Sequence, residues 1–284
     1  MLVAQITDIH LGFEPGNPDE LNRQRLDTTL HALTLMEPHP DILLATGDIA
    51  DDGDDMVSYE RWKEAISTLP FPVYPAMGNH DSRAPFLAAF PGQPVADGFL
   101  QYAIEDFPVR ILVLDTLETG RHGGGFCETR AQWLRARLAE QPGRPTLIVL
   151  HHPPIETGLS WMTENPDAAW VKRLEAIVEG QVNIVAMVAG HLHRPLVTRW
   201  AGTVLAVCPA TAPQVALDFE PMHADAPDNR PMIVADRPYF ALHYWNGREL
   251  ISHFDTAGTH DVLARFTAKR IPLIKMLKEE RAKA

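Results

Sequence analysis

Five short stretches of this 284-residue chain place Asp, His or Asn directly after a run of apolar residues. A buried strand that ends in such a residue projects it from the carboxyl edge of the sheet, where open α/β sheets hold their ligands. Carboxylate, imidazole and amide groups suit divalent metal ions, and the absence of cysteine from the set argues against a structural zinc site. The stretches supply Asp8 and His10, then Asp48, then Asn79, His80 and Asp81, then His151 and His152, and finally His191 and His193.

Asp48 is the residue on which we expect a two-metal site to depend. Two ions ~3.5–4 Å apart need a ligand that can bridge them, and each oxygen of a carboxylate can bind one ion. Asp8 and His10 are two positions apart, so we expect both to point to the same side of an extended segment and to hold one ion together. His191 and His193 repeat this spacing.

The elements that must position these residues alternate between apolar runs and amphipathic segments, which predicts an α/β fold. Strands are predicted at residues 2–7, 41–46, 71–77, 101–105, 110–114, 145–150 and 183–189. Helices are predicted at residues 19–36, 59–66, 86–90, 128–139 and 167–178.

Beyond residue 196 the pattern changes to short strands joined by turns. Residues 196–207 and 239–254 each indicate a hairpin, and Asn246-Gly247 is the strongest turn signal in the chain. Residues 209–238 are rich in Pro, Asp and Ala and predict a long surface excursion or a contact with another subunit. We therefore expect a catalytic domain at 1–208 and a C-terminal elaboration at 209–284, which completes the sheet, carries a peripheral helix and makes a possible oligomer contact.

The net charge of −12 and the pI near 5.5 argue against binding to long nucleic acid. Cys127 and Cys208 are too few for a disulfide framework. No apolar run approaches the length of a membrane span, and the first residues lack a basic segment followed by a cleavage site. We therefore expect a cytoplasmic protein without a membrane partner.

The five motifs together resemble those of the calcineurin-like metallophosphoesterases. Asp-x-His, Gly-Asp, Gly-Asn-His-Asp, a histidine after an apolar strand, and Gly-His-x-His occur here in that order between Asp8 and His193. Among these proteins the sequence is most similar to class III cyclic nucleotide phosphodiesterases and glycerophosphodiesterases. The resemblance implies a four-layer αββα sandwich, here with a C-terminal β-hairpin elaboration.

The resemblance also implies the roles of individual residues. One divalent ion is expected on Asp8, His10, Asp48 and His193, and a second on Asp48, Asn79, His151 and His191. His80 is expected to stabilise the transition state or to protonate the leaving alkoxide, with Asp48 as the bridging ligand. Asp81 and His152 are expected to fix the orientation of the ligands.

The implied reaction is hydrolysis of small phosphodiesters, either 3′,5′-cyclic nucleotides such as cyclic AMP or glycerophosphodiesters. A hydroxide shared by two Mn²⁺, Fe²⁺, Zn²⁺ or Co²⁺ ions is expected to attack phosphorus in line. Protein phosphatases that resemble this core carry an arginine shortly after Gly-Asp, whereas residues 51–55 here are mostly acidic. A dianionic monoester would be repelled there more than a monoanionic diester, which favours diesterase activity.

Two other functions are compatible with the same fold. A nuclease is disfavoured by the net charge, and a metal-free interaction scaffold is disfavoured by the complete set of ligands. Arg121, His122, Trp161 and Met162 are candidate substrate contacts because they follow strand ends, although packing is favoured for Trp161 and Met162. The resemblance further implies a homo-oligomer, a dimer or larger.

Overall fold

The computed structural model describes residues 1–223 and 225–283, which form two large β-sheets. In the first sheet, β1 (Leu2–Ile6), β2 (Ile42–Ala45) and β3 (Val73–Pro75) are parallel neighbours. β12 (Tyr239–Trp245) pairs antiparallel with β1, and β13 (Leu250–Thr256) pairs antiparallel with β12. The strand order is β13-β12-β1-β2-β3.

The observed β3 is shorter than the predicted strand at residues 71–77. Pro72 and Pro75 flank or end it, and proline cannot donate a hydrogen bond to a strand ladder. β3 accordingly lies at the edge of the sheet, where one side of the strand needs no partner.

The second sheet has the order β4-β5-β6-β7-β9-β8. β5, β6, β7 and β9 are parallel, whereas β4 and β8 pair antiparallel at the two edges. The strands are β4 (Tyr102–Ile104), β5 (Arg110–Val113), β6 (Thr146–Val149), β7 (Ile184–Ala189), β8 (Leu196–Trp200) and β9 (Thr203–Val207). A separate two-stranded sheet joins β10 (Gln214–Val215) to β11 (Ile233–Val234) within the excursion at residues 209–238.

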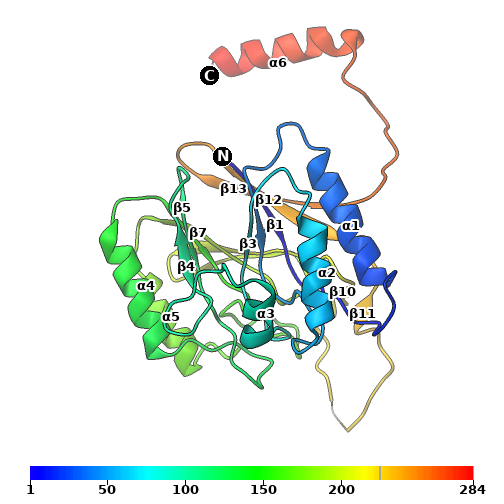
Figure 1. Ribbon diagram of the computed structural model, residues 1–284. Helices are drawn as coiled ribbons and strands as arrows, with labels where there is room; N and C mark the ends of the chain where they lie inside the picture. Colours follow the sequence, from blue (N-terminus) through cyan, green and yellow to red (C-terminus); the bar gives the residue numbers. More distant parts are fainter. Residues whose placement is uncertain (224, 284) are drawn as a thin grey trace.

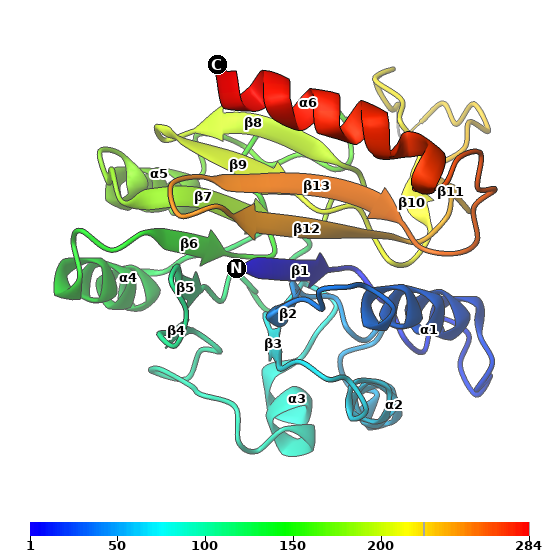
Figure 2. The same ribbon diagram turned by 90° about the horizontal axis from the view of Figure 1, so that it is seen from above.

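Helices cover the outer faces of the two sheets (Figures 1 and 2). α1 (Leu21–Thr34), α2 (Met56–Ile66) and α3 (Arg83–Ala89) lie beside the first sheet, and α4 (Glu128–Glu140) and α5 (Ala169–Val178) lie beside the second. Each helix contributes buried apolar residues to the core on its own side. The inner parallel strands β2, β5 and β6 are buried along their whole length, as parallel strands require, whereas β8 and β13 at the edges alternate between half-buried and exposed residues.

Alternating side chains of the second sheet show that the two sheets pack against each other. Ile111 and Val113 of β5 belong to a core shared with the first sheet, whereas Leu112 belongs to a core shared with α4 and α5. In β6, Leu147 belongs to the core shared with the first sheet, and Ile148 belongs to the core shared with α4 and α5. This two-residue period places the first sheet on one face and helices on the other, which confirms the predicted four-layer αββα arrangement.

The C-terminal segment extends away from this core. After β13 the chain leads to a short 3₁₀ helix (Ala268–Arg270) and to α6 (Ile271–Lys283), which stands clear of the sheets in Figure 1. Leu273, Met276 and Leu277 of α6 are exposed apolar residues. Among residues 1–223 and 225–283, no helix has the length and apolar character needed to cross a membrane.

Candidate metal centre

The candidate ligands lie where parallel strands of the two sheets end. Asp8, Asp48 and Asn79 follow β1, β2 and β3 of the first sheet. His151 and His191 follow β6 and β7, which are parallel neighbours in the second sheet. Because the carboxyl ends of parallel strands meet at one edge and the two sheets pack face to face, the five strand ends converge.

The backbone at five of the candidate ligands is left-handed rather than extended, so the predicted reason why Asp8 and His10 lie close together is wrong. Asp8 and His10 have φ values of 51° and 52°, and Asp48 has 51°. His191 and His193 have φ values of 73° and 52°. Asp and His enter this left-handed region at a cost of roughly 1–2 kcal/mol. The paired ligands therefore approach each other through tight loops after the strands rather than through strand alternation.

One group of side chains brings together Asp8, His10, Asp48 and His193. His193 Nε2 lies 3.3 Å from Asp8 Oδ1, and His10 Nε2 lies 3.8 Å from Asp48 Oδ2. The two imidazoles approach to 3.2 Å between their Nε2 atoms. Three of these residues, Asp8, His10 and His193, have ligand atoms within 4.8 Å of one another, which is the spacing that one bound ion requires.

A second group shares Asp48 with the first. His151 Nε2 lies 3.3 Å from Asp48 Oδ2 and 3.3 Å from Asn79 Oδ1. The rings of His151 and His191 lie 5.2 Å apart between centroids. The Asp48 carboxylate thus lies between the two groups, which is the place that a bridging ligand would occupy.

Hydrogen bonds on the far side of three imidazoles fix their orientation. His151 Nδ1 lies 2.7 Å from the Thr46 carbonyl oxygen, and His193 Nδ1 lies 2.8 Å from the Pro213 carbonyl oxygen. His10 Nδ1 lies 3.1 Å from Asp51 Oδ1. Because these oxygens only accept, each Nδ1 carries a proton, and Nε2 is the nitrogen that faces the centre and can bind a metal ion once it is deprotonated. This is the orientation and the supporting contact that metal-binding histidines have.

The electrostatics of the centre follow from its burial. Asp8 and Asp48 are 0% and 2% exposed. Burial alone would raise the pKa of Asp48, but His151 and His10 hold that pKa well below its usual range. Burial would lower the pKa of His151, but the Asp48 carboxylate raises it to about 9. Two buried anions that face several imidazoles form a site that attracts cations, because an unpaired buried charge is costly.

Asp81 connects the loop after β2 with the loop after β3. Its carboxylate accepts hydrogen bonds from the backbone nitrogens of Ile49 at 3.2 Å and Gly78 at 3.0 Å, and from the Tyr59 hydroxyl at 3.2 Å. Burial and the nearby Asp48 raise the pKa of Asp81 to about 6. Asp81 therefore fixes the position of the loops that carry Asp48 and Asn79.

His80 lies close to the ligand atoms of His10 and Asp48, whereas His152 lies close to those of His151 and His191. The backbone nitrogen of His80 donates to Asp48 Oδ1 at 2.8 Å, and His80 Nδ1 lies 2.8 Å from the carbonyl oxygen of Asp51. The side chain of His80 is 38% exposed and can reach a bound molecule. His152 is buried beside His191, with 4.8 Å between ring centroids, and its Nδ1 lies 2.9 Å from the Thr116 hydroxyl.

The candidate substrate contacts divide into two kinds. His122, Trp161 and Met162 border the same cavity as the metal ligands, and His122 Nδ1 lies 3.3 Å from Asn79 Nδ2. Arg121 is exposed and is not among the described residues that line this cavity.

Sequence reasoning did not identify the contact of Asp51 with His10. The Asp8-x-His10 and Gly47-Asp48 motifs did place the two loops that carry these residues at the same edge of the sheet.

Two glycines of the motifs are required by close packing at the centre. A Cβ atom on Gly78 would lie 2.1 Å from Asp48 Oδ1. A Cβ atom on Gly190 would lie 1.9 Å from the Thr7 hydroxyl. The glycines before Asn79 and His191 therefore let the loops of different strands approach one another.

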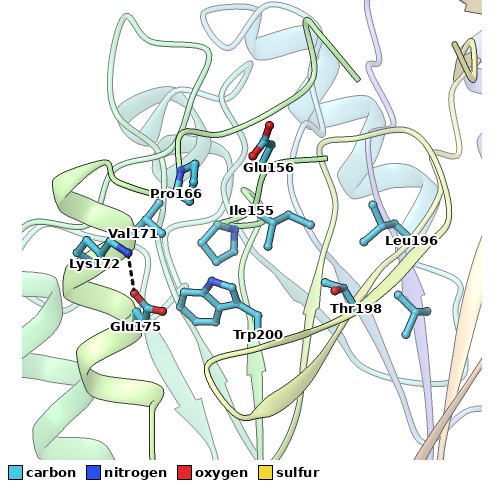
Figure 3. Close-up of a pocket in the computed structure, with 11 residues that line it drawn as sticks. Ile155, Glu156, Pro166, Val171, Lys172, Glu175, Leu196, Thr198 and Trp200 are labelled. Atoms are coloured by element: carbon cyan, nitrogen blue, oxygen red, sulfur yellow. Dashed lines mark hydrogen bonds and ion pairs between the residues drawn. The ribbon is translucent and has the colours of Figure 1, made fainter. Parts of the chain in front are cut away.

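The cavity that borders His10, Asp48, His191 and His193 has a volume of about 310 Å³. A second depression of about 410 Å³ lies between α5 and β8, where Ile155 and Trp200 border it (Figure 3). Two charged residues that border it are paired, with 3.3 Å between Lys172 Nζ and Glu175 Oε2. None of the candidate ligands is among the described residues that line this depression, so it is separate from the metal centre.

Comparison with known proteins identifies relatives that span most of the chain. A probable glycerophosphodiester phosphodiesterase, GpdQ, of Arcobacter nitrofigilis is 30% identical over 264 residues, which cover 91% of this chain and 94% of that protein. The 3′,5′-cyclic adenosine monophosphate phosphodiesterase CpdA of Escherichia coli K12 is 28% identical over 215 residues, covering 75% and 76% of the two chains.

The fold and the family follow from two further comparisons. The structure of purple acid phosphatase PPD1 from yellow lupin (Lupinus luteus) seeds aligns with a TM-score of 0.65 and 14% identity, over 92% of this chain and 52% of that one. Residues 1–195 match the family described as calcineurin-like phosphoesterase. The chain belongs to the calcineurin-like phosphoesterase family.

Proposed function

We propose that this protein is a dinuclear metal-dependent phosphodiesterase that hydrolyses small phosphodiesters. Its family is one of phosphoesterases, and its relatives are named as phosphodiesterases of glycerophosphodiesters and of cyclic AMP. The observation that supports the proposal most strongly is the set of three imidazoles whose Nε2 atoms face two buried carboxylates.

The donor set fits two divalent ions. Oxygen and imidazole donors suit Mn²⁺, Fe²⁺, Zn²⁺ or Co²⁺. One ion would be held by Asp8, His10, Asp48 and His193, and the other by Asp48, Asn79, His151 and His191. When bound, the ions would supply an activated water and would neutralise negative charge on the phosphoryl oxygens.

The residues of the chain would orient the substrate and handle the proton. His80 lies at the rim of the centre, where its imidazole, when both ring nitrogens are protonated, can donate the Nε2 proton to the departing alkoxide. Its Nδ1 contact with the Asp51 carbonyl oxygen leaves Nε2 free to face the substrate. Asp81, through the loops that it holds, keeps Asp48 and Asn79 in place.

Preference for a diester over a monoester is supported by the charge around the centre. Asp51 contacts His10, and Asp52 and Asp54 border the adjacent depression next to Asn79 and His80. A dianionic monoester would meet these carboxylates at a greater cost than a monoanionic diester.

The test is hydrolysis of a substrate panel by metal-free protein reconstituted with Mn²⁺. The panel contains cyclic AMP, glycerophosphoethanolamine, bis(p-nitrophenyl) phosphate and p-nitrophenyl phosphate. We expect kcat/KM for the aryl diester to exceed that for the aryl monoester. Preference for the monoester would contradict the charge argument, and the lack of hydrolysis of every diester with each of the four metals would contradict the proposal.

The proposal extends to the organisation of the chain. We infer a catalytic domain at 1–208 and an elaboration at 209–284, which is supported by the match at 1–195 and by the addition of β12 and β13 to the first sheet. The exposed apolar residues of α6 support a homo-oligomer. Cys127 and Cys208 are both free thiols, which is consistent with action in the cytoplasm.

A further inference from the structure

Exposed apolar side chains line one side of the cavity at the metal centre. Phe13 is 64% exposed, Leu21 is 44% exposed and Ile233 is 50% exposed. All three line the cavity that also contains His10, Asp48 and His193, and Trp161 lines it as well. Large apolar residues that gather beside a cluster of polar groups are a common feature of ligand sites.

These four side chains come from separate parts of the fold. Phe13 lies in the loop after β1, Leu21 is the first residue of α1, and Ile233 belongs to β11. Trp161 lies in the segment between β6 and α5. We call this set the apolar wall. The exposure of Phe13, Leu21 and Ile233 leaves these side chains available to a bound molecule, whereas Trp161 is half-buried against the core of the second sheet and presents only part of its surface to the cavity.

Three polar side chains next to the apolar wall already have partners within the chain. Asn22 Nδ2 donates to the carbonyl oxygen of His10 at 2.9 Å. Glu14 Oε2 accepts from Asn17 Nδ2 at 2.7 Å. His193 Nδ1 is bound to the Pro213 carbonyl oxygen. A substituent that rests on this wall therefore meets mainly carbon, and a hydroxyl group placed there would lose its bonds to water without equivalent replacement.

We propose that the apolar wall, Phe13, Leu21, Trp161 and Ile233, selects phosphodiesters that carry a flat, apolar ring on one substituent over those that carry only polyol or amine substituents. The inference rests on the proposed function, because the ring is placed by the phosphate at the metal centre. The cavity of about 310 Å³ is within the size range of small-molecule sites and opens directly onto the candidate ligands. Aromatic rings of the substrate would stack on Phe13 or Trp161.

The test compares two substrates in the full-length protein reconstituted with Mn²⁺. Bis(p-nitrophenyl) phosphate carries rings, and glycerophosphoethanolamine carries none. The test variants are Phe13→Ser and Ile233→Ser. The matched control is Val182→Ser, which removes a side chain that is 97% exposed and lies outside the cavity. Thermal unfolding of each variant verifies that the fold is retained.

We expect Phe13→Ser and Ile233→Ser to lower kcat/KM for the aryl diester about tenfold each, mainly through KM, because each removes apolar contact with the ring. In the two test variants, kcat/KM for glycerophosphoethanolamine should change less than about twofold. In Val182→Ser, kcat/KM for both substrates should change less than about twofold. Equal losses for both substrates, or a wild-type preference for glycerophosphoethanolamine, would overturn the inference while leaving the diesterase proposal intact. If wild-type protein hydrolyses neither diester with any of the four metals, the proposed function itself is overturned.

Discussion

At the scale of single residues, the centre depends on how its histidines are held. An imidazole can present either nitrogen, and the hydrogen bond made by one nitrogen decides which lone pair faces the metal. In His151 and His193 that bond goes to a backbone carbonyl, whereas in His10 it goes to the Asp51 carboxylate. Of these three histidines, His10 is therefore the one whose orientation depends on another side chain.

Asp51→Ala tests this dependence. The change removes the acceptor for His10 Nδ1 but keeps the backbone oxygen that contacts His80. We expect Mn²⁺ affinity, measured by titration of metal-free protein, to fall about tenfold or more, with a parallel loss of turnover. Asp54→Ala is the control, since it removes an exposed carboxylate of the same loop. Equal Mn²⁺ affinities for the two variants would show that the Asp51 side chain does not position His10.

At the scale of elements, the C-terminal strands are connected to the site by a buried polar network. His243 of β12 lies 2.9 Å from Gln5 Oε1 and 2.8 Å from the Ser252 hydroxyl. Gln5 Nε2 in turn donates to the Thr46 hydroxyl at 2.8 Å and to the Ala189 carbonyl oxygen at 2.9 Å. The network joins β13, β12, β1 and β2 to the end of β7 directly below the metal centre.

This network predicts a dependence of stability on pH. Burial lowers the pKa of His243 from 6.5 to about 4. Between these values the unfolded chain binds a proton that the folded chain does not, so the free energy of unfolding rises with pH. The contribution of His243 to the free energy of unfolding is fully present above about pH 6.5. It is lost as the pH falls towards 4, which lowers the free energy of unfolding by about 3 kcal/mol.

His243→Gln should remove the part of the pH dependence of the free energy of unfolding that arises from His243. Urea unfolding at about pH 7 and pH 4.5 should show a smaller loss of unfolding free energy in the variant than in wild type, by roughly 2–3 kcal/mol. His223→Gln changes an exposed histidine and serves as the control. An identical pH dependence in wild type and His243→Gln would refute the assignment.

The sequence predicted the elements and the motif order better than it predicted the local geometry. The apolar runs predict the parallel strands, and the polar residues that end these runs predict the side chains at the strand ends. The left-handed backbone at Asp8, His10 and His193 does not, because Asp and His also occupy extended conformations readily. The predicted explanation by strand alternation was therefore wrong, although the structure brings Asp8 and His10 to the same centre.

Sequence patterns could not predict the contacts between segments that lie far apart in the chain. Phe13 and Ile233 lie far apart in the chain and line one cavity only because the segment that carries β11 folds back to the site formed by the loop after β1. Arg121 and His122 are neighbours in sequence, yet only His122 lines that cavity. Periodicity describes one element at a time, whereas such placements depend on how several elements pack.

At the scale of the whole molecule, the two sheets bring the ligands together. The first sheet supplies Asp8, Asp48 and Asn79, and the second supplies His151 and His191. The net charge of −12 and the two buried carboxylates make the metal-free centre unfavourable for an anionic diester. We therefore expect bound cations to be needed for substrate binding as well as for reaction.

The most direct test is to count the metal ions bound per chain in parallel with diester turnover. Metal-free wild-type protein and Asn79→Ala are titrated with Mn²⁺, bound metal is measured by elemental analysis, and hydrolysis of bis(p-nitrophenyl) phosphate is followed at each step. We predict two ions per wild-type chain, with turnover rising as the second is bound. Asn79→Ala should bind its second ion more weakly and turn over at least about a hundredfold more slowly. One ion or none in active wild-type protein, or near-normal turnover with two ions in Asn79→Ala, would contradict the assignment of a dinuclear centre.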